Sequence, residues 1–114
     1  MDNKFLKRKK RVKVHIFGTK ERPRMSVYRS NKGLYVQIID DTLGKTVVAL
    51  SIKKLGKDII GKTKVEAGYL LGVKIAEMAK KKKIKKVIFD KSGYKYHGRV
   101  KAVAEGARKG GLIF

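Results

Sequence analysis

The fold is decided by residues 24–52, whose sequence is RMSVYRSNKGLYVQIIDDTLGKTVVALSI. Two clusters of turn-forming residues, Ser30–Gly33 and Asp40–Gly44, divide this stretch into three runs rich in β-branched and aromatic side chains. Short turns join antiparallel neighbours, so the stretch predicts a three-stranded meander whose third strand runs parallel to the first. The predicted strands are Arg24–Arg29, Leu34–Ile39 and Thr46–Ile52.

Two helices and a fourth strand are predicted beyond the meander. Thr63 and Glu66 have the spacing of a capping box, which begins a helix that runs to about Lys83. Lys85–Asp90 is a short apolar strand, and a last helix begins near Arg99, with its apolar residues at helical spacing. That helix is stopped by Gly110 and Gly111.

The order of predicted elements is βββαβα, with Lys53–Lys62 as a connection between the third strand and the first helix. A right-handed crossover through that helix places the fourth strand beside the first and parallel to it. The chain is therefore predicted to be an α/β protein. Its mixed four-stranded sheet has the order 3-2-1-4, is covered by two helices, and is preceded by a basic N-terminal arm.

The first helix presents a stripe of small residues. Steps of 100° place Gly68, Gly72, Ile75 and Ala79 on one face. Each glycine within a helix costs roughly 1 kcal/mol relative to alanine. We therefore expect these glycines to allow a close approach of the helix to the sheet.

The charge of the chain points to a polyanionic partner. Its 114 residues include 31 Lys plus Arg against 9 Asp plus Glu, a formal net charge of +22. Cationic side chains that neutralise phosphates release condensed counterions, so nucleic acid is the first candidate partner and an anionic membrane surface the second. Cysteine is absent, which excludes disulfides, thiolate metal sites and a cysteine nucleophile. No segment has the apolar length of a membrane span or a secretory signal, so a cytosolic protein is expected.

The size of the chain predicts one domain with an arm. Residues 1–24 hold ten basic and two acidic residues and are predicted to be a basic RNA-binding arm, flexible when free. The alternative for this range is a solvated tail. Residues 25–114 are predicted to form a single α/β RNA-binding domain.

Candidate RNA contacts fall on three segments. The arm supplies a basic run, the first strand places Arg24, Ser26 and Tyr28 opposite its buried face, and the segment before the last helix combines tyrosines, basic residues and glycine. A solvated strand face, a core tyrosine and a purely structural His97 are the alternatives. The candidates are Lys7, Arg8, Lys9, Lys10, Arg11, Lys13, Arg22, Arg24, Ser26, Tyr28, Arg29, Ser30, Asn31, Lys32, Tyr94, Lys95, Tyr96, His97, Gly98, Arg99 and Lys101.

Enzymatic and metal chemistry find little support in the sequence. The order βββαβα also occurs in metal-dependent nucleases, but that chemistry needs an acid on the first strand, and Arg24–Ser30 contains none. His15 and His97 lack the spacing of zinc ligands, and no glycine-rich nucleotide loop is present. No catalytic residue, metal or cofactor is predicted.

Three stretches resemble the bacterial form of the eighteenth large-subunit ribosomal protein: GTKERPRMSVYRSNK at 18–32, YVQIIDD at 35–41 and VIFDKSGYKYHGRVKA at 87–102. The resemblance implies a structural protein of the cytoplasmic ribosome that binds 5S ribosomal RNA. It further implies attachment of that RNA to 23S ribosomal RNA in the central protuberance, near the fifth large-subunit protein. It assigns no role to residues 53–64 or 111–114.

Two hypotheses follow for function. One is a structural protein specific for 5S ribosomal RNA; the other is a generic RNA-binding or chaperone module that uses the same arm without selecting a shape. A specific protein retains affinity from shape and base contacts when salt and competitor RNA are added, whereas a generic one does not. In either case we expect a monomer when free and no membrane partner.

Overall fold

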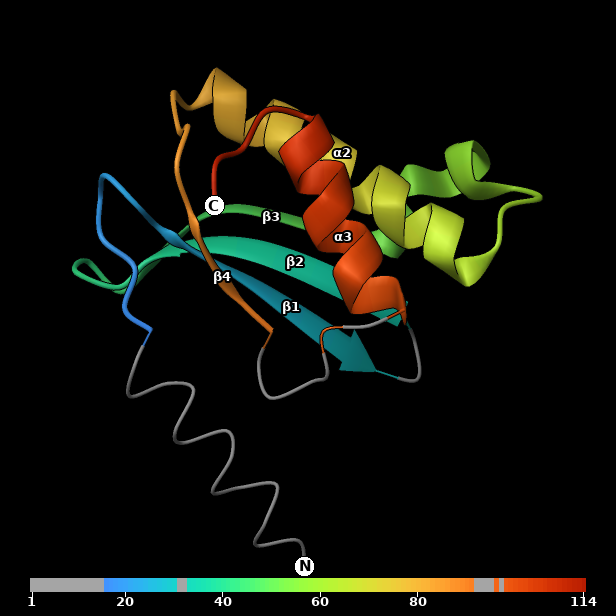
Figure 1. Cartoon of the computed structure of the whole chain (residues 1–114), viewed down its shortest axis with the longest axis horizontal. Coiled ribbons are helices and arrows are strands. Elements are labelled where there is room, and N and C mark those ends of the chain that lie inside the picture. The colour runs from blue at the N-terminus through green and yellow to red at the C-terminus, as the bar shows by residue number, and fades with distance from the viewer. Residues whose placement is uncertain (1–15, 31–32, 92–95, 97) are drawn as a thin grey trace, which may run out of the picture.

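A mixed four-stranded sheet with helices on one side forms the body of the protein (Figure 1). The computed structural model describes residues 16–30, 33–91, 96 and 98–114. The strand order β3-β2-β1-β4 confirms the predicted order 3-2-1-4. In chain order the elements are β1 (Arg24–Ser30), β2 (Gly33–Asp40), β3 (Lys45–Ser51), the 3₁₀ helix η1 (Ile52–Ile59), α2 (Lys64–Lys81), β4 (Ile88–Asp90) and α3 (Gly98–Lys109).

The pairing of the strands is as predicted. β1 pairs antiparallel with β2 from Arg24 opposite Ile39 to Ser30 opposite Gly33, and β2 pairs antiparallel with β3. β4 joins the other edge of β1 and runs parallel to it, with Arg24 opposite Ile88. The crossover through α2 therefore returns the chain to the strand at which the sheet began.

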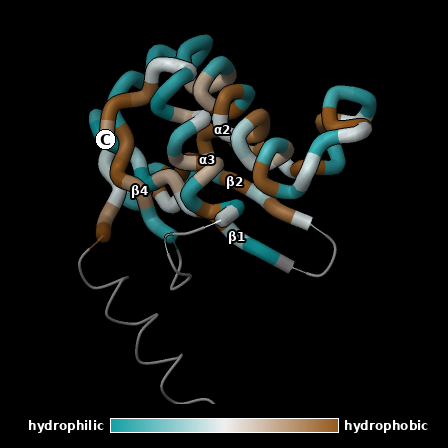
Figure 2. The backbone as a smooth tube through the Cα atoms, turned by 45° about the vertical axis from the view of Figure 1, so that its right-hand side comes forward, coloured by the Kyte–Doolittle hydropathy of each residue, from teal (hydrophilic) through white to brown (hydrophobic). Residues whose placement is uncertain are grey.

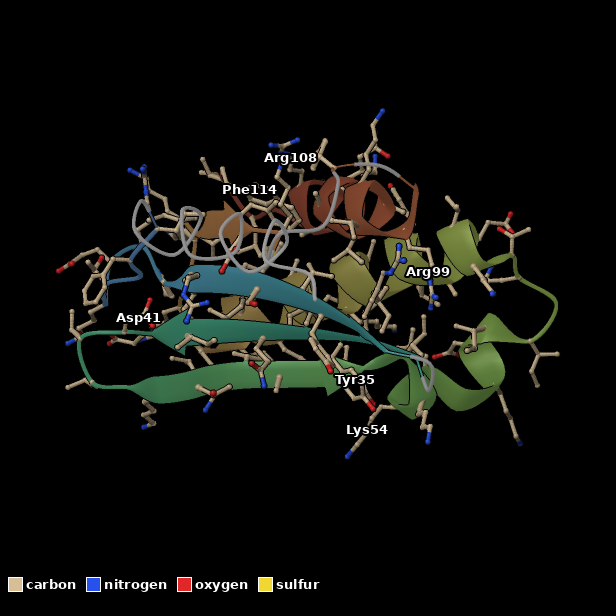
Figure 3. All side chains as sticks on the ribbon, turned by 90° about the horizontal axis from the view of Figure 1, so that it is seen from below. Tyr35, Asp41, Lys54, Arg99, Arg108 and Phe114 are labelled. Atoms are coloured by element: carbon tan, nitrogen blue, oxygen red, sulfur yellow. The ribbon has the colours of Figure 1, made fainter. Side chains whose placement is uncertain are left out.

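Alternate residues of the sheet face a core. Met25 and Val27 of β1 and Val36 and Ile38 of β2 are fully buried beneath the helices, as period-two alternation requires. Figure 2 shows hydrophobic residues along β2 and hydrophilic ones at the end of β1. The opposite face of the sheet is not covered by any described element (Figure 3).

Hydrogen bonds between residues close in sequence determine where α2 begins and ends. Glu66 N donates to Thr63 Oγ1 at 3.1 Å and Thr63 N donates to Glu66 Oε1 at 2.9 Å, which confirms the capping box. At the other end Ile84 N donates to Ala79 O and Lys83 N to Lys80 O, the two bonds of a Schellman motif. Among the described helices, none is long and apolar enough to cross a membrane.

The expectation that the glycine stripe of α2 approaches the sheet is wrong. A Cβ added at Gly72 would collide with the carbonyl oxygen of Val103, and one at Gly68 would lie 3.1 Å from Arg99 O, so the stripe faces α3. α3 also has a glycine at the contact, because a Cβ at Gly106 would collide with Tyr69 O of α2. The glycines therefore bring two helix backbones together, while larger residues of α2, Leu71 among them, reach the core of the sheet.

Three segments differ from the simple prediction. The connection after β3 contains η1, which buries Ile52 and Leu55 and is kinked at Gly56, where φ is 50°. Part of the range assigned to the arm lies against the sheet: Gly18 N donates to Asp41 Oδ2 at 2.7 Å, and Asp41 N donates to Gly18 O at 2.9 Å. The regular part of the fourth strand is shorter than Lys85–Asp90 because the chain before it bridges to Ile113 instead.

Candidate nucleic-acid interface

The uncovered face of the sheet carries two neighbouring tyrosines. Tyr28 of β1 stands opposite Tyr35 of β2, with ring centroids 6.1 Å apart, and 52% of Tyr28 is exposed. Exposed aromatic rings stack on bases at about 1–3 kcal/mol per base. Tyr35 was not among the sequence candidates. Counting outward from the turn between Ser30 and Gly33 would have found it, since that pairing places Tyr35 beside Tyr28.

Arg99 lies at the start of α3 and close to Arg29 at the end of β1. Its Nε is buried and has no hydrogen-bond partner among the described residues. Burial lowers the pKa of Arg99 below its ordinary value, and the like charge of Arg29 lowers it further. Figure 3 shows Arg99 at the end of the sheet opposite to Asp41. A partly buried guanidinium beside another guanidinium and a helix N-terminus is a favourable place for an anion such as phosphate.

Gly98, the first residue of α3, has a φ of 59°. A residue with a Cβ adopts this left-handed conformation only at a cost, and glycine does so freely. Gly98 therefore sets the direction in which α3 leaves the preceding segment and places Arg99.

Arg24, which the sequence placed among the RNA contacts, has its guanidinium directed at two carboxylates. Nε and Nη2 donate to Asp41 at 2.9 and 3.0 Å, and Nη1 donates to Asp90 at 3.0 Å. Asp90 is only 2% exposed. These bonds lower the pKa of Asp41, chiefly through the Arg24 guanidinium, and raise that of Arg24. Arg24 thus joins the ends of β2 and β4 to β1.

The same contacts bear on the nuclease alternative. A two-metal site needs carboxylates that converge on cations. Here Asp41 and Asp90 converge on Arg24, while Asp40 accepts bonds from the backbone N and the hydroxyl of Thr42. Within residues 16–30, 33–91, 96 and 98–114, no three acidic or histidine side chains group as metal ligands would.

Tyr96, the described tyrosine of the segment between β4 and α3, is 38% exposed. Its ring meets the ring of Phe89 edge to face, with centroids 5.9 Å apart, and its hydroxyl accepts a 3.3 Å hydrogen bond from Arg108. The structure therefore places Tyr96 between a core contact and solvent.

Some of the other predicted contacts lie within the described residues and the rest lie outside them. Arg22 is exposed just before β1, Ser26 is half-buried on the uncovered face, Ser30 ends β1, and Lys101 is exposed on α3. The structure thus brings the end of β1, with Arg29, to the start of α3, while Arg22 lies at the opposite end of β1. The remaining candidates lie outside the described residues: Lys7, Arg8, Lys9, Lys10, Arg11, Lys13, Asn31, Lys32, Tyr94, Lys95 and His97.

Comparison with known proteins agrees with the resemblance. The family described as ribosomal L18 of archaea, bacteria, mitochondria and chloroplasts matches residues 2–114. The large ribosomal subunit protein uL18 of Clostridium botulinum (strain Langeland) is 55% identical over 108 residues, covering 95% of this chain and 90% of that protein. The uL18 proteins of Thermotoga petrophila and Thermotoga neapolitana are 52% and 50% identical over 111 residues, covering 96% of this chain and 91% of each relative. The chain belongs to the ribosomal L18 family.

Proposed function

We propose that this chain binds 5S ribosomal RNA and attaches it to 23S ribosomal RNA in the central protuberance of the large subunit of the cytoplasmic ribosome. Its neighbours there include the fifth large-subunit protein. It acts without catalysis, cofactor or metal, and it is a monomer when free. The family membership and the name of its relatives, large ribosomal subunit protein, support this role.

The observation that carries the RNA-binding proposal is the position of Arg99. Its buried Nε lacks a partner among the described residues, and every cause that acts on its pKa opposes the charged form. A phosphate oxygen would supply both the missing acceptor and the missing counter-charge. The exposed Tyr28 and neighbouring Tyr35, on the uncovered face of the sheet, would offer a second surface for bases or ribose.

The proposed site consists of three parts. The arm follows the RNA backbone through its basic run. The uncovered face of β1 contributes Ser26 and Tyr28, while Arg29 alternates with them and lies on the side of the sheet that faces α3. Tyr96 and the start of α3, with Gly98, Arg99 and Lys101, make up the third part. Arg24 supports this surface through its bonds to Asp41 and Asp90. Asn31, Lys32, Tyr94, Lys95 and His97 lie outside the described residues and stay predictions of the sequence.

The test is a titration of labelled 5S ribosomal RNA at near-physiological salt with excess unlabelled transfer RNA. Retention at nanomolar protein concentration is expected for a shape-specific complex. Loss of the complex to the competitor would instead favour the generic RNA-binding module, in which charge alone holds the RNA.

Arg99→Gln separates RNA contact from structural support. The variant should weaken 5S RNA binding and flatten its salt dependence by roughly 0.7 to 0.9 in slope for the lost phosphate contact. The melting temperature of the free protein should not fall, because without RNA the Arg99 guanidinium is desolvated and is repelled by Arg29. Lys57→Gln, an equal change of charge on exposed η1, is the control and should leave affinity near that of the wild type. A variant that melts earlier and binds normally would assign Arg99 to the fold.

A further inference from the structure

Phe114 belongs to a cluster of four side chains that contact one another, here called the Phe114 cluster: Phe89, Tyr96, Arg108 and Phe114. The rings of Phe114 and Phe89 stack with centroids 5.6 Å apart and an interplanar angle of 17°. The Arg108 guanidinium carbon lies 4.4 Å from the Phe114 ring centroid, and Figure 3 shows these two residues together beside α3. Because Phe89 and Arg108 also contact Tyr96, Phe114 touches two groups that hold Tyr96.

The backbone fixes where the Phe114 ring lies. Ile113 N donates to Lys85 O at 2.9 Å, and Val87 N donates to Ile113 O at 3.1 Å, so this segment pairs with the chain leading into β4. Leu112 is 4% exposed and anchors the segment to the core. Arg108 Nε also donates to Phe114 O at 3.2 Å. The ring is therefore held by pairing, burial and a side-chain bond at once.

We propose that Phe114 is a positioning residue for Tyr96 in RNA binding, an inference that rests on the proposed function above. Phe114 acts through Phe89 and Arg108 and does not itself touch RNA. Tyr96 is held at its ring and at its hydroxyl, yet more than a third of its surface is exposed. A side chain held in place before binding loses less rotamer freedom when it contacts a base or ribose.

Phe114→Ala tests the role, with Ile113→Ala as the matched control from the same segment. Ile113 is 56% exposed and holds the segment through backbone groups that alanine keeps. Phe114→Ala should weaken 5S RNA binding roughly 2- to 12-fold, the equivalent of one side chain that must be ordered on binding. Ile113→Ala and the conservative variant Phe114→Tyr, which keeps a ring, should bind as the wild type does.

A double-mutant cycle with Tyr96→Ala distinguishes positioning from general destabilisation. In the Tyr96→Ala background, Phe114→Ala should cause no further loss of RNA affinity, although it should still lower the melting temperature because it removes the ring stacked on Phe89. In the free protein, the ¹³C ring signals of Tyr96 should shift with Phe114→Ala and not with Ile113→Ala.

Two results would overturn the proposal. One is an equal loss of affinity whether or not Tyr96 is present, which would mean that Phe114 acts on the whole fold. The other is unchanged affinity of Phe114→Ala in the wild-type background. Failure of the proposed function would be seen separately, in the wild-type protein, if transfer RNA displaced it from 5S RNA. That result would overturn the proposed function and the role of Phe114 together.

Discussion

Arg24 shows how one side chain can hold three strands. Its guanidinium donates to Asp41, the residue directly after β2, and to buried Asp90 at the end of β4, while its backbone belongs to β1. Asp41 in turn receives a bond from Gly18 N. Hydrogen bonds with charged partners contribute about 1.5–3 kcal/mol each when they are partly buried, so this node fixes one end of the sheet.

The node predicts a pH dependence of stability through Asp41. Arg24 holds the pKa of Asp41 below its ordinary value, so the bonds stabilise the fold above pH ~4, and the stabilisation is lost as pH falls through the lower folded pKa. At pH 7, Asp41→Asn should lower the free energy of unfolding by about 1 kcal/mol. Measured by thermal melting, this difference from the wild type should shrink toward pH 2.

Asp58→Asn is the control, because Asp58 is an exposed aspartate on η1. It should melt close to the wild type at neutral pH. A difference between Asp41→Asn and the wild type that stayed constant from pH 7 to pH 2 would show that the carboxylate charge is not what Arg24 requires.

At the scale of elements, the packing of α2 on α3 depends on glycines from both helices. Gly68 lies beside Arg99 near the start of α3, and Gly110 beside Ala76 later in α2, so the two helices run in the same direction. At Gly72 and Gly106 the facing helix backbone occupies the space that a Cβ would need. The sequence predicted the need for close approach, because two helical glycines are costly, but periodicity cannot tell which neighbour comes close.

Gly72→Ala should therefore destabilise the protein although alanine is the better helix former. Collision with the backbone of Val103 forces α2 and α3 apart, and the expected loss is about 2 kcal/mol or more in free energy of unfolding. Gly68→Ala is the matched comparison, since its Cβ would lie 3.1 Å from Arg99 O and needs only a small shift. Denaturant unfolding that ranked the two variants in the opposite order would contradict this account of the interface.

The end of α2 offers a prediction in the opposite direction. Lys83 occupies the left-handed position of the Schellman motif with a φ of 62°, where glycine is the usual residue. Lys83→Gly should raise the free energy of unfolding by about 0.5–1 kcal/mol. Lys82→Gly removes the same charge at a residue whose φ is −95°, and should give no such gain. Equal melting temperatures for Lys83→Gly and Lys82→Gly would show that the backbone of Lys83 is not strained.

At the scale of the whole molecule, the sequence predicted those features that depend on neighbours along the chain. Turns such as Asp40–Gly44 define the meander, and the capping box at Thr63 defines the start of α2. The features it missed join distant residues. Arg24 was read as a surface residue since its carboxylates lie 17 and 66 residues away. Phe114 has no predicted role because Ile113 stands where the family resemblance leads us to expect an acid, and its contacts with Phe89 and Arg108 are visible only in the folded chain.

The candidate site was predictable to a similar degree. Alternation along β1 correctly placed Ser26 and Tyr28 opposite the buried face. The approach of Arg29 to Arg99 required the parallel pairing of β4 with β1, which brings the start of α3 to the end of β1. The residue spacing within β1 or within α3 alone does not indicate that Arg29 and Arg99 lie close together.

Deletion of residues 1–13 tests the arm. The described fold begins at Ile16 and Gly18 bonds to Asp41, so the truncated protein should keep its melting temperature. Its affinity for 5S RNA should fall, and the slope of log affinity against log salt should flatten by roughly 0.7–0.9 for each lost phosphate contact. A full-length variant with glutamine at the basic residues of 7–13 controls for length and should behave alike. An unfolded truncated protein would place the arm within the core.

The pairing of β4 with β1 has a consequence for the order in which the molecule assembles. β1, β2 and β3 are linked by short turns, whereas Arg24 meets Ile88 only after η1 and α2 have been traversed. Contacts between residues far apart in sequence form late and slowly, since a long loop must first close. Because α3 follows β4 in the chain, we expect Arg29 and Arg99 to come together only after β4 has paired with β1. Under the proposed function, RNA would therefore bind fully folded molecules in preference to partly folded ones, so that RNA binding selects correctly folded protein.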